Sequence, residues 1–189
     1  MQEIKNIISS SIQTKELILN NEELLHKIVQ SIDVIESAFK QHNKVWFCGN
    51  GGSAADAQHL AAEFSGRFYK NRKALPAEAL HCNSSYLTAV ANDYSFDVVY
   101  SRLIEGIGKA GDVLIAISTS GNSANIINAI ESANKMDITT IGFTGETGGK
   151  MKEISNILIN VPSTTTPRIQ ESHILIGHII CEIVEARLF

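Results

Sequence analysis

Residues 44–57 read KVWFCGNGGSAADA, an apolar run that turns through glycines into a helix-forming stretch. The apolar residues 45–48 predict a buried strand, and the small residues that follow Ser53 predict a helix. A strand that passes through glycines and a hydroxyl residue into a helix leaves backbone N–H groups unpaired beside the positive end of the helix dipole. Such a junction is a favourable place for a phosphate group.

A second segment, residues 113–123 with the sequence VLIAISTSGNS, repeats this arrangement. Neither segment carries the Lys-Ser/Thr pair of a P-loop after its last glycine, and the dinucleotide pattern G-x-G-x-x-G is also absent. Either loop taken alone fits an ordinary turn, because Gly and Ser are common turn residues. Two such loops, each rich in hydroxyl groups, favour one phosphorylated ligand held between them.

Apolar runs alternate with helix-forming stretches over the rest of the chain. The runs are residues 45–48, 77–81, 113–117, 139–143 and 157–161, and helices are expected to start near Ser53, Ser84, Asn122, Thr147 and Pro167. This alternation predicts βαβ units, and therefore an α/β fold, a three-layer αβα sandwich with a five-stranded parallel sheet. Ligands bind at the carboxyl ends of the strands in such sheets, which is where both loops fall.

Both ends of the chain predict long helices. Apolar residues recur near a 3.6-residue period from Thr14 to Lys40, which predicts one amphipathic helix. Between residues 169 and 189 they surround most of the helix, which predicts burial on more than one side. We expect one domain, residues 1–189, whose N-terminal helical segment 1–40 is used in oligomerisation. The alternative is a monomer that packs both terminal helices onto its own sheet.

Composition narrows the possible partners and the compartment. The 189 residues carry a net charge of −4, which argues against a nucleic-acid binder with a basic surface. The sequence shows neither a signal peptide nor a bilayer-spanning stretch, so we expect a cytoplasmic protein with no membrane partner. The widely spaced Cys48, Cys82 and Cys181 indicate neither disulfides nor a thiolate zinc cluster and are expected to be buried. The basic run 70–73 is expected to be a solvated loop.

Two groups of polar residues near the loops are candidates for metal binding or proton transfer. His59 and Glu63 are spaced i and i+4, so they project from one face of the helix that Ser53 opens. This spacing suits two metal ligands, a base with a partner, or a simple surface contact. The C-terminal helix carries Gln170, His173 and His178 among aliphatic residues. Spacing alone does not choose between the two histidines.

Four motifs of this chain closely resemble the phosphoheptose isomerases of the sugar isomerase (SIS) domain superfamily. They are GNGGSAADAQH at 49–59, AND at 91–93, ISTSGNS at 117–123 and RIQE at 168–171. The resemblance implies isomerisation of sedoheptulose 7-phosphate to D-glycero-D-manno-heptose 7-phosphate for the heptose of lipopolysaccharide or capsule. It also implies the flavodoxin-like SIS fold, a cytoplasmic homotetramer with active sites at subunit interfaces, and one zinc per subunit.

The resemblance also assigns roles to individual residues. Its substrate contacts fall on Asn50, Gly51, Gly52, Ser53, Asn92, Asp93, Ser118, Thr119, Ser120, Ser123 and Gln170. Its metal ligands fall on His59, Glu63, Gln170 and His178, which selects His178 over His173. Moving a carbonyl from C2 to C1 requires a base and a proton shuttle. Our hypothesis gives these roles to Glu63 and His178, with zinc or Gln170 steadying the oxygens.

Two alternatives use the same pocket without turnover. One is an adaptor of the DiaA type, which associates with the replication initiator DnaA and lacks the acid and the final histidine that correspond to Glu63 and His178. The other is a non-catalytic sugar-phosphate-binding protein. Because this chain has both residues, the sequence favours the enzyme.

Overall fold

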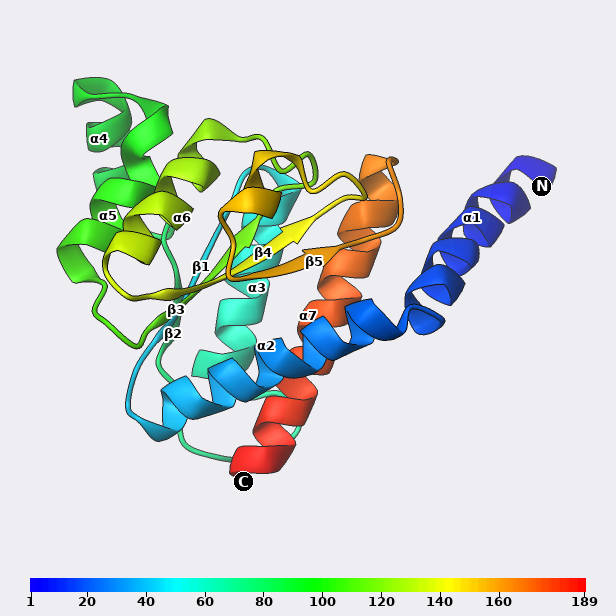
Figure 1. The fold of residues 1–189 in the computed structure, drawn as a ribbon, viewed down its shortest axis with the longest axis horizontal. Coiled ribbons are helices and arrows are strands. Elements are labelled where there is room, and N and C mark those ends of the chain that lie inside the picture. Colours follow the sequence, from blue (N-terminus) through cyan, green and yellow to red (C-terminus); the bar gives the residue numbers. More distant parts are fainter.

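A five-stranded parallel sheet lies at the centre of the computed structural model, which describes residues 1–189 (Figure 1). The strands are β1 (Val45–Gly49), β2 (Ala77–Ala79), β3 (Val113–Ile117), β4 (Thr139–Thr144) and β5 (Ile157–Asn160). They are ordered β2-β1-β3-β4-β5, and every neighbouring pair is parallel. This confirms the predicted α/β sandwich with its five-stranded sheet.

Helices cover both faces of the sheet. They are α1 (Gln2–Leu19), α2 (Glu22–Lys40), α3 (Gly52–Ser65), α4 (Ser84–Asp93), α5 (Val99–Ile107), α6 (Ala124–Lys135) and α7 (Thr166–Leu188), with short 3₁₀ turns η1 (Phe96–Val98) and η2 (Gly149–Glu153). Buried residues of α2, α3 and α7 form one hydrophobic core, and those of α4, α5 and α6 form the other. None of these helices combines the length and the apolar character that a membrane crossing requires.

Strand β1 illustrates why the strands are apolar throughout. Val45 and Phe47 belong to the core under α2, α3 and α7, whereas Trp46 and Cys48 belong to the core under α4, α5 and α6. Successive side chains of a strand point to opposite faces, so a strand buried on both faces contains no polar alternation. The buried run at 45–48 is therefore what a central parallel strand requires.

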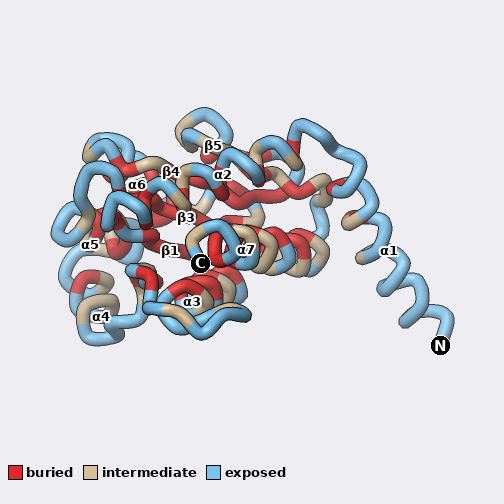
Figure 2. Tube along the Cα trace, turned by 90° about the horizontal axis from the view of Figure 1, so that it is seen from below, coloured by how far each residue is buried: buried red, intermediate tan, exposed pale blue.

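The predicted helix 14–40 is wrong as one continuous element. The chain breaks at Asn20 and Asn21, and the Asn21 side chain accepts the backbone N–H of Leu24 to begin α2. Asparagine side chains compete for backbone hydrogen bonds in this way, which the apolar periodicity alone does not reveal. Helix α1 projects from the body of the molecule and is largely exposed (Figures 1 and 2).

Helix α7 packs between α2 and α3, which confirms its predicted burial on more than one side (Figure 2). Other expectations needed correction. The element expected near Thr147 is only the short turn η2, and α5 was not expected at all. Cys48 and Cys181 are buried as expected, but Cys82 is exposed because it follows the three-residue edge strand β2 in a turn.

Candidate functional site

The two predicted loops meet at the carboxyl ends of β1 and β3. These strands are neighbours in register, with Gly49 opposite Ile117. Between the loops lies a cavity of about 120 Å³, which we call the cradle; it is lined by Asn50, Ser53, Ile117, Ser118, Thr119, Ser120, Ser123 and Gln170. Sequence prediction named seven of these eight residues, the exception being Ile117.

Hydroxyl groups of the second loop gather on one side of the cradle. The Ser118 Oγ lies 3.1 Å from the Ser123 Oγ and 3.5 Å from the Ser120 Oγ. Gly121 makes this tight loop possible, because its φ is +65° and a Cβ there would lie 2.1 Å from the Gly148 carbonyl oxygen. The loop can therefore present several hydroxyl donors to one anion.

Two helices begin at the cradle with no capping side chain. Gly51 precedes α3 and Ser123 precedes α6, and neither supplies a side-chain hydrogen bond to its helix. The first turn of a helix has N–H groups without intrahelical partners. Both helix starts can therefore donate backbone N–H groups to an anion, which is the arrangement that the sequence predicted.

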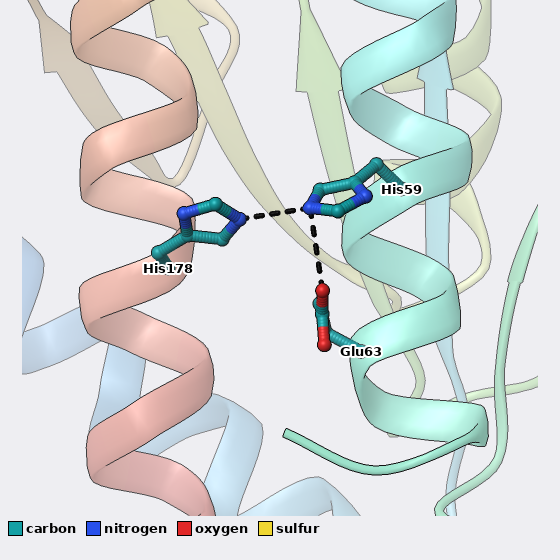
Figure 3. A group of neighbouring side chains, drawn as sticks. All are labelled: His59, Glu63 and His178. Carbon is teal, nitrogen blue, oxygen red and sulfur yellow. Dashed lines mark hydrogen bonds and ion pairs between the residues drawn. The ribbon is translucent and has the colours of Figure 1, made fainter. Parts of the chain in front are cut away.

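His59, Glu63 and His178 form a compact group on two adjacent helices (Figure 3). The His59 Nε2 lies 2.9 Å from the His178 Nε2 and 3.3 Å from the Glu63 Oε1. One ligand atom from each residue can be chosen so that all three lie within 4.8 Å of one another. Helix α3 brings His59 and Glu63 one turn apart, and α7 delivers His178.

The structure brings His178, not His173, to this group. His173 is fully buried, and its Nε2 lies 3.0 Å from the Thr144 carbonyl oxygen, to which it donates. Burial lowers its pKa to about 4, although the bond to Thr144 opposes this effect. His173 is therefore a neutral core residue. The choice that spacing left open depends on which side of α7 faces α3.

Other predicted residues lie apart from the His59 group. Gln170 lines the cradle and lies against Gly52, where a Cβ would come within 2.6 Å of the Gln170 Nε2. Eight residues of helix, roughly 12 Å along the axis, separate it from His178. Asn92 and Asp93 are exposed at the end of α4 and do not line the cradle.

Sequence reasoning missed Asp56, which lies one helical turn before His59 on α3. Its Oδ2 atom is buried and has no hydrogen-bond partner. Burial raises the pKa of this carboxyl group, while the nearby His59 and His178 act in the opposite direction. Asp56 on α3 is therefore close enough to both His59, on the same helix, and His178, on α7, for the three groups to interact electrostatically. The sequence signal that was available is an acidic residue three positions before His59, a predicted metal ligand.

The basic run 70–73 is not simply a solvated loop. The Arg72 side chain is only 2% exposed, and its Nε lies 2.9 Å from the Glu185 Oε1. The Glu185 carboxylate also accepts the backbone N–H groups of residues 68–70, and Arg72 donates to the Glu63 and Phe64 carbonyl oxygens. This buried brace ties the end of α3 to α7, and its two partners are 113 residues apart.

The brace also lowers the pKa of the Glu185 carboxyl group strongly. Burial raises the pKa of Glu185, but its three backbone N–H donors and Arg72 together outweigh that effect and hold the pKa at about 2. The loop that Glu185 organises includes Phe68, whose ring centroid lies 5.7 Å from that of His178. The brace therefore supports the wall against which His178 rests.

Comparison with known proteins gives a consistent result. The SIS domain family matches residues 11–145. Phosphoheptose isomerase from Clostridium acetobutylicum is 52% identical over 182 residues, covering 96% of this chain and 93% of that protein. The Aneurinibacillus thermoaerophilus phosphoheptose isomerase is 52% identical over 186 residues, covering 98% and 94%. The structure of a phosphoheptose isomerase from Neisseria gonorrhoeae superposes with a TM-score of 0.92 at 41% identity, covering 98% of each chain.

Proposed function

The chain belongs to the phosphoheptose isomerases of the SIS domain family, and from this premise we propose which of its residues hold the substrate and which move protons. It isomerises sedoheptulose 7-phosphate to D-glycero-D-manno-heptose 7-phosphate, a step of heptose biosynthesis. The observation that carries the residue assignment is the group of His59, Glu63 and His178, which stands ready on the same two helices that border the cradle.

In this proposal the cradle binds the phosphate group. Ser118, Ser120 and Ser123 donate hydroxyl hydrogen bonds, and the first N–H groups of α3 and α6 donate from the backbone. The net charge of −4 makes such local donors necessary, since the protein as a whole does not attract anions. Gly51, Gly52, Ser53, Thr119 and Gln170 complete this substrate contact set.

Isomerisation moves protons between neighbouring carbon and oxygen atoms. Glu63 takes a proton from C1 of the ketose, and the C2 oxygen gains a proton from His178, which leaves an enediol. A proton then returns to C2 while the C1 hydroxyl loses its own, which produces the aldehyde. A carboxylate and an imidazole at this spacing provide both functions.

The same three residues suit a metal ion. Two imidazoles and a carboxylate are preferred zinc ligands, and two nitrogens on one tetrahedral zinc lie roughly 3.3 Å apart, close to the 2.9 Å between the His59 and His178 nitrogens. His59, Glu63 and His178 would hold the ion. Gln170, the fourth ligand that the resemblance implies, lies roughly 12 Å from His178 along α7, so a neighbouring subunit would have to supply it. When bound, zinc polarises the substrate carbonyl. A carboxylate engaged by zinc is a weaker base, so the two roles of Glu63 compete.

We also propose a cytoplasmic homotetramer with active sites at subunit interfaces. Helix α1 exposes Ile4, Ile7, Ile8 and Ile12, a row that a second chain could cover. Gln170 lies roughly 12 Å from His178 along α7, and Asn92 and Asp93 lie outside the cradle. These separations support a site that residues of a neighbouring subunit complete.

The direct test mixes the purified protein with sedoheptulose 7-phosphate and follows the aldoheptose phosphate by NMR, with and without a chelator. Formation of the aldose supports the assignment, and binding without turnover would indicate the sugar-phosphate-binding alternative. The adaptor alternative is less favoured, because it does not require the assembled group of His59, Glu63 and His178.

A further inference from the structure

Asn50 and Asn125 exchange two hydrogen bonds across the base of the cradle. The Asn50 Nδ2 donates to the Asn125 Oδ1 at 2.9 Å, and the Asn125 Nδ2 donates back to the Asn50 Oδ1 at 2.9 Å. Asn50 belongs to the loop after β1, whereas Asn125 is in the first turn of α6, after β3. The pair therefore joins the two loops that form the cradle.

The two asparagines differ in their access to a ligand. Asn50 lines the cradle, but both ends of its side-chain amide already face Asn125. Asn125 is only 2% exposed and does not line the cradle. The pair uses one of the two Asn50 Nδ2 hydrogens and one acceptor site of its Oδ1, so both bonds to Asn125 can persist when a ligand occupies the cradle.

A separate hydrogen bond, made by Tyr100 of α5, anchors the backbone at the start of the first loop. The Tyr100 hydroxyl donates to the Gly49 carbonyl oxygen at 2.6 Å, and Tyr100 is buried. A Cβ at Gly49 would lie 2.4 Å from the Ser53 carbonyl oxygen, so the chain turns tightly here. Tyr100 anchors the start of this loop to α5, and the Asn50 side chain connects the loop to α6.

We propose that Asn125 is a positioning residue that sets the spacing of the two halves of the cradle, acting through Asn50. Asn50 then serves substrate binding through this pair, which holds the first loop against the start of α6. The inference rests on the proposed role of the cradle as the phosphate site.

The chemistry of the pair suits this role. Two neutral amides fix a distance between loops without placing a charge beside the bound anion, whereas a carboxylate at either position would repel it. Both bonds are partly buried, and on the Asn125 side, where that residue is 2% exposed, an amide left without its partner incurs a desolvation penalty. The hydroxyl donors of the loop before α6 and the N–H donors of α3 consequently keep their relative positions before the ligand arrives.

A double-mutant cycle separates positioning from direct contact. The variants are Asn50→Ala, Asn125→Ala and the double variant, with Asn128→Ala as control, because Asn128 is on the same helix but bonds to the Asp97 carbonyl oxygen outside the cradle. The readouts are the dissociation constant of inorganic phosphate by calorimetry, and KM and kcat with sedoheptulose 7-phosphate.

We expect each single variant to raise both the phosphate dissociation constant and KM by roughly fivefold, the loss of about one buried hydrogen-bond interaction. The change in kcat should stay below about twofold, since phosphate contacts bind substrate and transition state equally. The double variant should be no weaker than either single variant, and Asn128→Ala should match the parent protein. Equal, non-additive losses are the signature of a pair that works as one unit.

Additive losses, or a loss in Asn50→Ala with Asn125→Ala unchanged, would overturn the proposal and show direct contact by Asn50. If Asn125→Ala lowers the melting temperature too far for measurement, Asn125→Ser takes its place, since it keeps a small polar group in the helix start. The phosphate titration needs no turnover. An inactive parent protein would therefore count against the proposed function and leave the cycle able to decide this inference.

Discussion

The His59 Nε2 lies 2.9 Å from the His178 Nε2, although 119 residues separate them in the chain. One of the two nitrogens must carry a proton for this contact to be a hydrogen bond, or both must direct lone pairs at a shared cation. The Glu63 carboxylate lies 3.3 Å from the same His59 nitrogen and adds a negative ligand. The geometry thus supports both proton transfer and metal binding.

Metal binding can be measured without turnover. We expect the protein to bind one zinc per chain. His178→Ala should weaken the affinity for zinc by more than about 100-fold, because a ligand is lost outright. Competition with a chromophoric chelator measures the zinc stoichiometry and the zinc affinity. His26→Ala is the matched control, since His26 is an exposed histidine on α2. Unchanged zinc affinity in His178→Ala would remove this residue from the ligand set.

Glu63→Gln should lower kcat by about 10²- to 10⁴-fold, the usual contribution of a general base. Phosphate affinity should remain near that of the parent protein, because Glu63 does not line the cradle. Steady-state kinetics and calorimetry give the two quantities, and Glu131→Gln, an exposed acid on α6, serves as control. Substantial retained turnover would reject Glu63 as the base.

The Arg72–Glu185 brace should make stability depend on pH in acid. The folded pKa of Glu185 is about 2, below its ordinary value of 4.5, so its contribution is complete above pH 4.5 and disappears as pH falls towards 2. Glu185→Gln should cost about 3 kcal/mol at pH 7, because it leaves Arg72 buried without its partner.

Chemical denaturation at several pH values tests this expectation. The stability difference between the parent protein and Glu185→Gln should be constant above pH 4.5 and shrink below it. Arg72→Lys should not preserve stability, because lysine does not reproduce the several directed bonds of the guanidinium group. A difference that stays constant down to pH 2 would contradict the ionised brace.

Gly121→Ala should disrupt the second loop. Its φ of +65° disfavours a side chain by about 1–2 kcal/mol, and the new Cβ would lie 2.1 Å from the Gly148 carbonyl oxygen. We expect a lower melting temperature and weaker phosphate binding. Gly106→Ala is the contrasting control, because its φ is not in the left-handed region and nothing lies within 4 Å of a Cβ there. This control should be neutral or stabilise α5 by about 0.5–1 kcal/mol.

Local sequence patterns were sufficient to predict the strands of the sheet and the two loops that form the cradle. The runs at 45–48 and 113–117 are apolar at every position, which only a strand buried on both faces requires, and each is followed at once by glycine and hydroxyl residues. The positions of the two loops then follow from the rule that parallel strands end at the same edge of a sheet. The break at Asn21 escaped prediction, because apolar periodicity continues across it.

By itself, the amino-acid sequence determined the five strands, the helices α3, α4, α6 and α7, and which residue types begin α3 and α6, since these depend on neighbours in the chain. Only the tertiary structure decided that His178 and not His173 faces His59, that Asn125 hydrogen-bonds to Asn50, and that Glu185 forms an ion pair with Arg72. These pairs join residues between 75 and 119 positions apart. Their contacts depend on how α6 and α7 rotate and pack against their neighbours, which no local pattern encodes.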